Sequence, residues 1–445
     1  GRVARLLDMT FPSEVLLFRN SFIALLLSIT PSFSGSVIFL HPDGTGLGHW
    51  NAMRLLTVGP DGITHWDSLE RLAAYRPHQK NWLSTTSHAG ATVHAYGKKV
   101  HHDSFGMDRD QPILSASGSP LTILQEAQSY GVRTGIVNSG HIAEPGTAVF
   151  VASSESRKNT LEIAASVMES GTDVIFAGGE LQLIPENAVG HFGLNGLRTD
   201  GRNLLKEAEE RGYKVIFTRE ELRALGPETE KVIGIFAPGD TYNFGKEIMI
   251  QKMGVPLYRP DAPTIAEMTA AALRVLGEDP SKEFFLIAEE EGTDNFSNSN
   301  NAAGMLEAAA RADEAIGIAL EYLSNHPDRD TLLLVASDSD AGHPTVFAPR
   351  EVDVDTLLPE RDDNGAPIHG PDGIGGAPFV SLPDSFGNRH PFGIAWATYY
   401  DFPGSVVAKA NGYQSESLGS DFDNTDIYQL IRKALFGSDP LNSEE

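Results

Sequence analysis

The chain has 445 residues, 41% of them hydrophobic, with a formal net charge of −26 and no cysteine. The acidic excess argues against a nucleic-acid-binding surface, because a phosphate backbone requires basic side chains along it. The lack of cysteine excludes disulfides, thiolate metal sites and cysteine nucleophiles. The length fits two domains or one large α/β domain.

The N-terminal part of the chain holds its only strong apolar run, residues 15–30. Arg19 and Asn20 interrupt this run, so it is too short to span a membrane. The apolar residues that follow Arg19, and the small residues after them, are typical of a secretory signal. We expect residues 1–34 to hold this signal and the residues upstream of it, which predicts a periplasmic or secreted protein with no transmembrane segment in its mature form. The alternative is a buried N-terminal strand or helix.

Strand and helix patterns alternate along the rest of the chain. Short apolar stretches typical of buried strands begin near residues 36, 133, 173, 283 and 331. Helical stretches separate them, for example near residues 158–170, 264–277 and 305–324. Strands that alternate with helices of this length indicate a largely parallel sheet with helices on both faces. We therefore predict an α/β fold, a three-layer α/β/α sandwich around a large, mostly parallel central sheet.

Two stretches are less regular than the rest. Residues 181–260 contain one clear helix pattern, then a strand and loops, and residues 344–391 are rich in Pro, Gly and Asp. Loops of that length inside an α/β domain are usually functional. We expect residues 35–440 to form a single catalytic domain that carries these two segments as excursions.

Four hydroxyl residues, 84–87, stand directly ahead of the small residues Ala89, Gly90 and Ala91. Ser and Thr favour the N-cap position, so this segment is explained by the start of a close-packed helix. It is also explained by a nucleophile at a helix start, with small neighbours that leave room for a substrate. The pattern alone does not separate the two interpretations.

Acidic residues recur where the predicted strands end. Asp43 follows "VIFLHP", Glu289 follows "FFLIA", and Asp338 follows "LLLVAS". In open α/β sheets the binding site lies at the carboxyl ends of the strands. A single acid after a strand is more often a helix cap, but several together predict an oxygen-rich pocket for divalent cations.

From about residue 37 to 437, these segments resemble the alkaline phosphatase family in chain order. "PDGTG" at Asp43 is similar to the family's strand-ending Asp-Gly, which bridges two metal ions. Residues 86–92 resemble the family's nucleophile segment, which implies that Ser87 is the nucleophile. "SESRKN" resembles its Ser-Arg-Lys motif, which implies that Arg157 binds phosphate.

The resemblance also implies a set of metal ligands. "AEPGTAVFVA" is similar to the segment with the family's magnesium-binding Thr, and "LIAEEEGTDN" is similar to its metal-ligand strand. The set carried over to this chain is Asp43, Ser87, Glu144, Thr147, Glu289, Asp294, Asn298, Asp338, Ser339 and His390.

The chain departs from the family pattern at three places. Thr86 stands where the family has an Asp before the nucleophile, and Asn298 and Ser339 stand where it has zinc-binding histidines. His390 remains as the one imidazole in the set. Neutral oxygens and carboxylates suit hard ions, so we expect magnesium first, with zinc, calcium or manganese as alternatives.

The resemblance implies a hydrolase, a metal-dependent phosphomonoesterase that acts on small phosphate monoesters through a phosphoserine on Ser87. Metal coordination lowers the pKa of a Ser hydroxyl, and an Arg fork binds two phosphate oxygens, which fits Ser87 and Arg157. A homodimer is implied by the family alone. The alternatives are a phosphodiesterase of the same superfamily and a non-catalytic phosphate- or cation-binding protein, although pure binding does not need a nucleophile.

Overall fold

The structure is a computed structural model that describes residues 34–404 and 406–437. The expected secretory signal lies outside these residues, so it stays a prediction. Within the two described ranges, no helix is both long and apolar enough to cross a bilayer.

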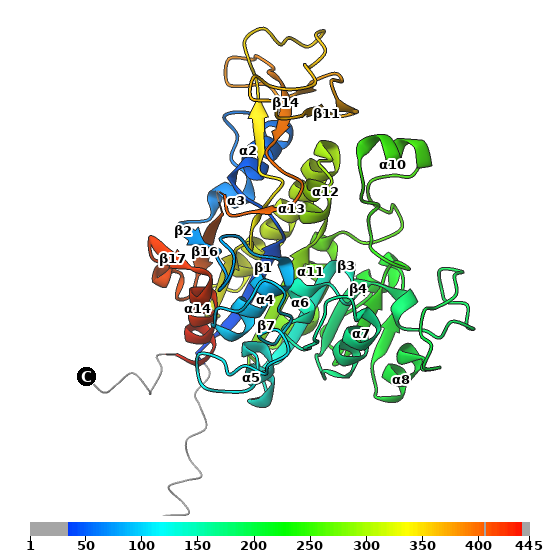
Figure 1. Ribbon diagram of the computed structural model, residues 1–445. Coiled ribbons are helices and arrows are strands. Elements are labelled where there is room, and N and C mark those ends of the chain that lie inside the picture. Colours follow the sequence, from blue (N-terminus) through cyan, green and yellow to red (C-terminus); the bar gives the residue numbers. More distant parts are fainter. Residues whose placement is uncertain (1–33, 405, 438–445) are drawn as a thin grey trace, which may run out of the picture. The chain divides into compact units, whose positions relative to one another are not determined.

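A ten-stranded sheet forms the centre of this part of the chain (Figure 1). Its strands are β1 (Ser36–Pro42), β2 (Arg71–Arg76), β3 (Arg133–His141), β4 (Val174–Gly178), β5 (Lys214–Ile216), β6 (Val232–Ile235), β7 (Phe284–Glu290), β8 (Thr331–Val335), β16 (Val407–Gly412) and β17 (Asp421–Asp423). They lie in the order β17-β2-β16-β8-β1-β7-β3-β4-β6-β5. All strands from β8 to β5 in this order are parallel, whereas β16 is antiparallel to both of its neighbours.

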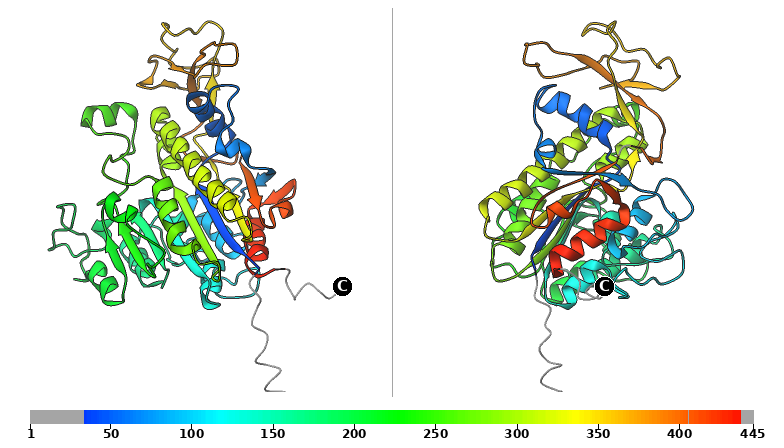
Figure 2. Two further views of the ribbon diagram at one scale, coloured as in Figure 1. Left: turned by 180° about the vertical axis from the view of Figure 1, so that it is seen from behind. Right: turned by 90° about the vertical axis from the view of Figure 1, so that its left-hand side faces the viewer.

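Helices cover both faces of the sheet, as the two views of Figure 2 show. One face carries α4 (Ser87–Tyr96), α5 (Ile123–Ser129), α7 (Thr160–Glu169), α8 (Leu204–Glu210) and α14 (Asn424–Phe436). The other carries α2 (Leu47–Thr57), α9 (Arg219–Arg223), α11 (Ile265–Gly277) and α13 (Ala302–Asn325). The predicted three-layer α/β/α fold with a large, mostly parallel sheet is confirmed.

Strand β1 shows why the sequence forms two cores. Val37 and Phe39 pack into the core under α4 and α14, whereas Ile38 and Leu40 pack into the core under α11 and α13. Successive side chains of a strand point to opposite faces, so a continuous apolar run suits a strand that is covered on both sides. Polar side chains therefore gather beyond the strand ends.

The two less regular segments have different structures. Residues 181–260 contribute β5 and β6 to one edge of the main sheet, and also α10 (Glu247–Met253). Residues 344–396 form a separate small sheet, seen around β11 and β14 in Figure 1. Its strands are β10 (Pro344–Phe347), β11 (Ile368–Gly370), β12 (Gly373–Ile374), β13 (Phe379–Val380) and β14 (Pro391–Trp396). The chain then returns through β15 (Asp401–Phe402), which pairs with β9 (Asp340–Ala341) next to the end of β8.

Candidate active site

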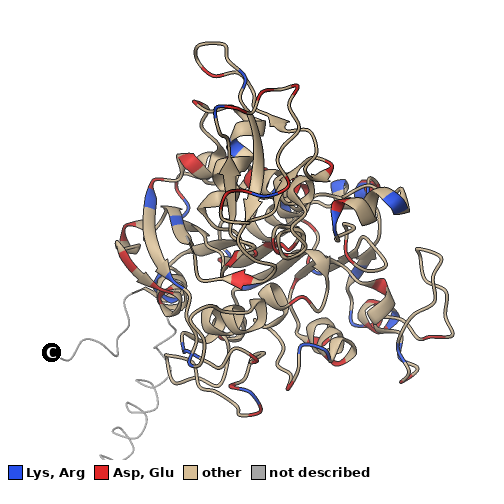
Figure 3. Cartoon of the chain, turned by 45° about the horizontal axis from the view of Figure 1, so that its top comes forward, with Lys and Arg blue, Asp and Glu red and all other residues tan. Residues whose placement is uncertain are grey.

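Three carboxylates meet at one edge of the main sheet. Asp43 follows β1 directly, Glu289 lies at the end of β7, and Asp338 follows β8. These strands are adjacent and parallel, in the order β8-β1-β7, so their carboxyl ends lie together. All three side chains are 0% exposed. Figure 3 shows acidic residues near the centre of the molecule as well as along its rim.

Two further acids join them from helix α12 (Gly292–Asn298) and the turn before it. One carboxylate oxygen each of Asp43, Glu291 and Asp294 lies within 4.8 Å of the others. The resemblance to the family implied Asp294 as a ligand but not Glu291. The only signal for Glu291 is its place in the run "EEEG", and that run does not show which of its acids faces the site.

A third group forms around Asn298. Its Nδ2 donates to both oxygens of Asp294, at 3.0 and 2.9 Å, and to Oδ1 of Asp401 at 3.2 Å. Asp401 lies in β15 and reaches this position because β15 pairs with β9. No local pattern in the sequence predicts a ligand at Asp401.

Burial and mutual repulsion shape the charge of this cluster. Burial raises the pKa values of Glu289, Glu291, Asp294 and Asp338, and the negative charges of neighbouring acids raise them further. Burial also acts to raise the pKa of Asp43, but the neighbouring His41 imidazole and Asp338 carboxyl outweigh it, so that pKa is lowered. A cation bound among these carboxylic acids would allow all of them to be ionised at the same time.

The unpaired oxygens of the cluster suit metal ions. Both carboxylate oxygens of Asp43, Oε1 of Glu289 and Oδ2 of Asp338 are buried and have no hydrogen-bond partner. Buried polar atoms are normally paired, so several unpaired acceptors at one place indicate that something electropositive completes them. Carboxylate oxygens are the donors that hard divalent cations prefer.

Ser87 is the first residue of helix α4 and lies beside Asp43. The hydroxyl of Thr86 caps the helix by accepting a hydrogen bond from the Ala89 N–H at 3.2 Å. Ser87 is 3% exposed, and its hydroxyl is close enough to Asp43 to help lower the pKa of that carboxyl. Gly90 brings the helix close, since a Cβ there would lie 2.6 Å from Cβ of Asp338. The hydroxyl run thus supplies both a cap and a serine inside the cluster.

Arg157 lies at the open side of the cluster. It follows α6 (Pro145–Ala148), and its Nη2 is 3.4 Å from Oε2 of Glu144. Its side chain is 41% exposed, against 7% for Glu144. Burial acts to lower the pKa of Arg157, but the charges of Glu144 and Glu291 outweigh it and raise that pKa. The guanidinium therefore stays charged where solvent meets the site.

Two of the remaining predicted ligands, Thr147 and Ser339, lie beside the carboxylates. Oγ1 of Thr147 accepts a hydrogen bond at 2.9 Å from Nδ2 of Asn138, and the same amide nitrogen donates to Glu289. Oγ of Ser339 donates to Oδ1 of Asp338 at 3.3 Å. Both residues are buried, Thr147 at 2% and Ser339 at 0% exposure.

His390 lies elsewhere in the fold. It precedes β14 in the small sheet, and its Nε2 is 2.8 Å from Oδ2 of Asp384. Its side chain is 48% exposed, in contrast to the buried carboxylates. The structure does not bring His390 to the cluster, and Asp401 lies beside Asp294 and Asn298 instead.

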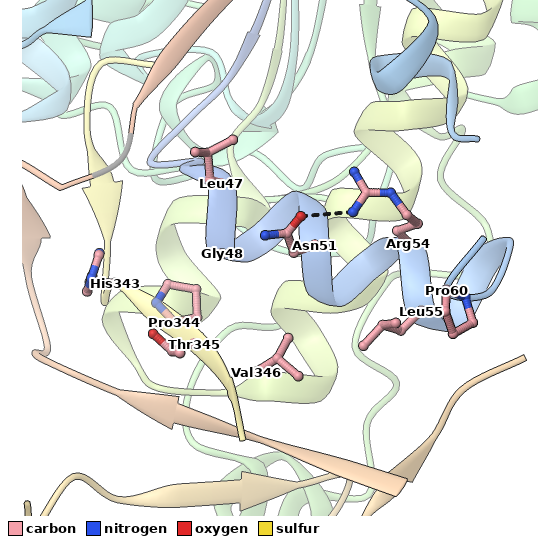
Figure 4. A pocket seen from close by; sticks show the side chains of 10 residues that line it. All are labelled: Leu47, Gly48, Asn51, Arg54, Leu55, Pro60, His343, Pro344, Thr345 and Val346. Atoms are coloured by element: carbon pink, nitrogen blue, oxygen red, sulfur yellow. Dashed lines mark hydrogen bonds between the residues drawn. The ribbon is translucent and has the colours of Figure 1, made fainter. Parts of the chain in front are cut away.

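A cavity of about 460 Å³ between α2 and β10 has different chemistry (Figure 4). It is lined by Leu47, Gly48, Asn51, Arg54, Leu55, Pro60, His343, Pro344, Thr345 and Val346. None of these is a carboxylate. One of the lining residues, His343, has its Nδ1 2.7 Å from Oδ2 of Asp340.

Comparison with known proteins identifies the family. A family model described as alkaline phosphatase matches residues 35–362. Alkaline phosphatase 4 of Bacillus subtilis is 26% identical over 70% of this chain, which spans 63% of that relative. Alkaline phosphatase H of Pseudomonas aeruginosa is 25% identical, with 93% of this chain and 87% of the relative aligned. The solved alkaline phosphatase of the Antarctic bacterium TAB5 has the same fold, with a TM-score of 0.67 and 20% identity over 90% of this chain and 97% of its own.

The family model covers well over half of the chain, so the chain belongs to the alkaline phosphatase family. It is a phosphatase of that superfamily. The resemblance seen in the sequence is confirmed at this level.

Proposed function

We propose that this protein is a metal-dependent phosphomonoesterase that forms a phosphoserine on Ser87. The observation that carries the proposal is the position of Ser87. It is the first residue of α4, its hydroxyl lies beside Asp43 and helps lower the pKa of that carboxyl, and it is surrounded by buried carboxylate oxygens that have no hydrogen-bond partner. A serine in that setting has no evident structural task, whereas a nucleophile needs such surroundings.

The residues around Ser87 have separate tasks in this mechanism. Arg157 binds two oxygens of the phosphate through its planar fork, and the backbone N–H groups at the start of α4 add to the positive field there. Asp43 lies beside the Ser87 hydroxyl, where it would share a cation with the serine oxygen. The serine oxygen attacks phosphorus as the bond to the leaving alcohol breaks, and water then displaces the serine from the phosphate.

Divalent cations, when bound, lower the pKa of the serine hydroxyl and neutralise the charge that develops on the leaving oxygen. We propose that three groups of residues hold them. One consists of Asp294, Asn298 and Asp401; the second of Asp43, Asp338, Ser339 and Ser87; the third of Asp43, Glu144, Thr147 and Glu289. A solved variant of the TAB5 enzyme has Mg bound in its M3 site, which supports magnesium as one of the ions.

The amide of Asn298 fits this role once it is turned. Its Nδ2 lies between Asp294 and Asp401, and its Oδ1 is buried without a hydrogen-bond partner. Rotation of the amide presents Oδ1 to an ion between the two carboxylates, since the amide O and N are almost the same in shape. This gives an all-oxygen site where the family pattern has imidazole, which favours magnesium, manganese or calcium.

The proposal is tested by turnover of p-nitrophenyl phosphate and of bis(p-nitrophenyl) phosphate by the reconstituted protein. We expect the monoester to be hydrolysed faster and phosphate to be trapped on the peptide that contains Ser87. Faster hydrolysis of the diester would make the protein a phosphodiesterase. A protein that binds metal and phosphate but turns over neither substrate would be a binding protein.

A further inference from the structure

A histidine lies inside the strand that ends at the site. His41 is in β1, two residues before Asp43, and is 1% exposed. Its Cα pairs with that of Glu289 in β7, and Glu289 pairs with Asn138 in β3. Side chains that are in register on neighbouring parallel strands point to the same face, so His41, Glu289 and Asn138 form one row.

The hydrogen bonds of His41 define its tautomer. Its Nδ1 is 3.1 Å from the carbonyl oxygen of Ala336. A carbonyl oxygen can only accept, so Nδ1 carries the proton, and in the neutral ring Nε2 presents a lone pair. That Nε2 lies 3.4 Å from Oδ1 of Asp43 and 3.9 Å from Oε1 of Glu289.

Four unpaired acceptor atoms thus face one another. Nε2 of His41, both oxygens of Asp43 and Oε1 of Glu289 are all buried without a hydrogen-bond partner. The other oxygen of Glu289 is occupied by the amide of Asn138. Lone pairs that converge in a dry site repel one another unless a cation lies between them.

We propose that His41 is a metal ligand through Nε2, on an ion that it shares with Asp43 and Glu289. A ligand imidazole whose other N–H donates to a backbone carbonyl is the usual arrangement at metal sites, and His41 already has it. His41 is outside the ligand set predicted from the sequence. The inference rests on the metal dependence in the proposed function, but it does not require that the protein hydrolyse anything.

An imidazole changes which ion this site prefers. Carboxylates alone suit magnesium, calcium and also manganese, whereas an imidazole donor favours the transition ions, from manganese to zinc, over magnesium and calcium. The site of Asp294, Asn298 and Asp401 offers only oxygen. The protein is therefore expected to hold two kinds of site, and the one with His41 discriminates against magnesium more strongly.

The first test uses the unaltered protein. Crystals of the manganese-loaded chain are measured on both sides of the manganese absorption edge, and turnover is assayed on the same preparation. We expect an anomalous peak about 2.0–2.3 Å from Nε2 of His41, with Nδ1 still on the Ala336 carbonyl. Manganese at other sites without a peak there, or no bound manganese at all, overturns the inference. A peak without turnover upholds it and overturns the hydrolytic function.

The second test compares His41→Gln with His94→Gln. His94 is a matched control because it is also buried, its ring centroid lies 5.6 Å from that of His41, and its Nε2 is bonded to the Tyr75 hydroxyl. We expect His41→Gln to weaken manganese binding at one site by at least about tenfold. Mutating a group that hydrogen-bonds to a metal ligand already weakens metal binding about tenfold or more, and removing the ligand itself should weaken it at least as much. His94→Gln should keep that site. Unchanged manganese stoichiometry and affinity in a folded His41→Gln protein would refute the role of His41.

Discussion

The carboxylates of Asp294 and Asp401 share one amide group, although they come from different parts of the chain. Nδ2 of Asn298 donates to both, at 2.9 Å and 3.2 Å. Asp294 lies on α12 beside the end of β7, whereas Asp401 lies in β15, which follows the strands of the small sheet along the chain. The long excursion therefore ends by delivering a carboxylate to the site.

We expect Asp401→Asn to lower both metal affinity and turnover, by at least about tenfold in turnover, because the proposed ligand loses its charge. His390→Ala should change neither, since His390 is exposed and paired with Asp384. Metal titration by calorimetry and turnover of p-nitrophenyl phosphate measure the two effects. The opposite pattern would return His390 to the ligand set and remove Asp401 from it.

Ser87→Ala should abolish turnover and leave no phosphorylated peptide. Thr86→Ala should keep measurable turnover, because the Thr86 hydroxyl caps α4 and its loss costs only about 1 kcal/mol of stability. Mass spectrometry of acid-quenched protein locates the phosphate. A phosphopeptide that maps to Thr85 or Thr86 would contradict the assignment of Ser87.

Arg157→Lys should weaken product inhibition by inorganic phosphate and reduce kcat/KM, because a point charge replaces a two-pronged donor. Arg202→Lys is a suitable control, since Arg202 is paired with Glu169 and Glu207 outside the site. If both kinetic quantities stay at the wild-type level in Arg157→Lys, the phosphate is held by another group.

The metal-free protein should lose thermal stability as the pH rises above about 4, the ordinary pKa of a carboxylic acid, into the alkaline range. The pKa values of Glu289, Glu291, Asp294 and Asp338 are raised by folding, so these acids stabilise the fold while protonated and destabilise it as they ionise. Melting curves in EDTA measure the effect, and Glu291→Gln should flatten the slope. Saturating magnesium should remove the trend, since the cation neutralises the ionised acids. A metal-free protein that becomes more stable over this range would show that the cluster is not repulsive.

Chelation with EDTA should abolish turnover. Magnesium, manganese or calcium, added singly, should restore it at least as well as zinc, because most donors in the cluster are oxygens. Manganese is expected to be the best single ion if His41 is a ligand, since it suits both imidazole and carboxylate. Restoration by zinc alone would mean that histidines outside the three oxygen groups control the site.

The sequence by itself determined the fold class and the family. Apolar runs followed by acids predict buried parallel strands, and adjacent parallel strands bring residues such as Asp43, Glu289 and Asp338 to one edge. The start of α4 could likewise be predicted, because Thr86 is of a residue type that helices prefer at the N-cap position. These features are encoded locally, where a strand or helix ends, and they need no knowledge of the rest of the chain. Their roles as ligands and nucleophile stay predictions for the experiments above.

Only the tertiary structure decided which other residues reach the site. Asp401 lies there because β15 pairs with β9 after a long excursion, and His390 lies apart because it belongs to that excursion. In the sequence, His41 is simply one polar residue within a predicted apolar strand. Its row with Glu289 comes from the register of β1 against β7, and its free Nε2 comes from a bond to a carbonyl beyond β8. Register and the return path of a long loop depend on contacts between distant segments, so local pattern could not predict them.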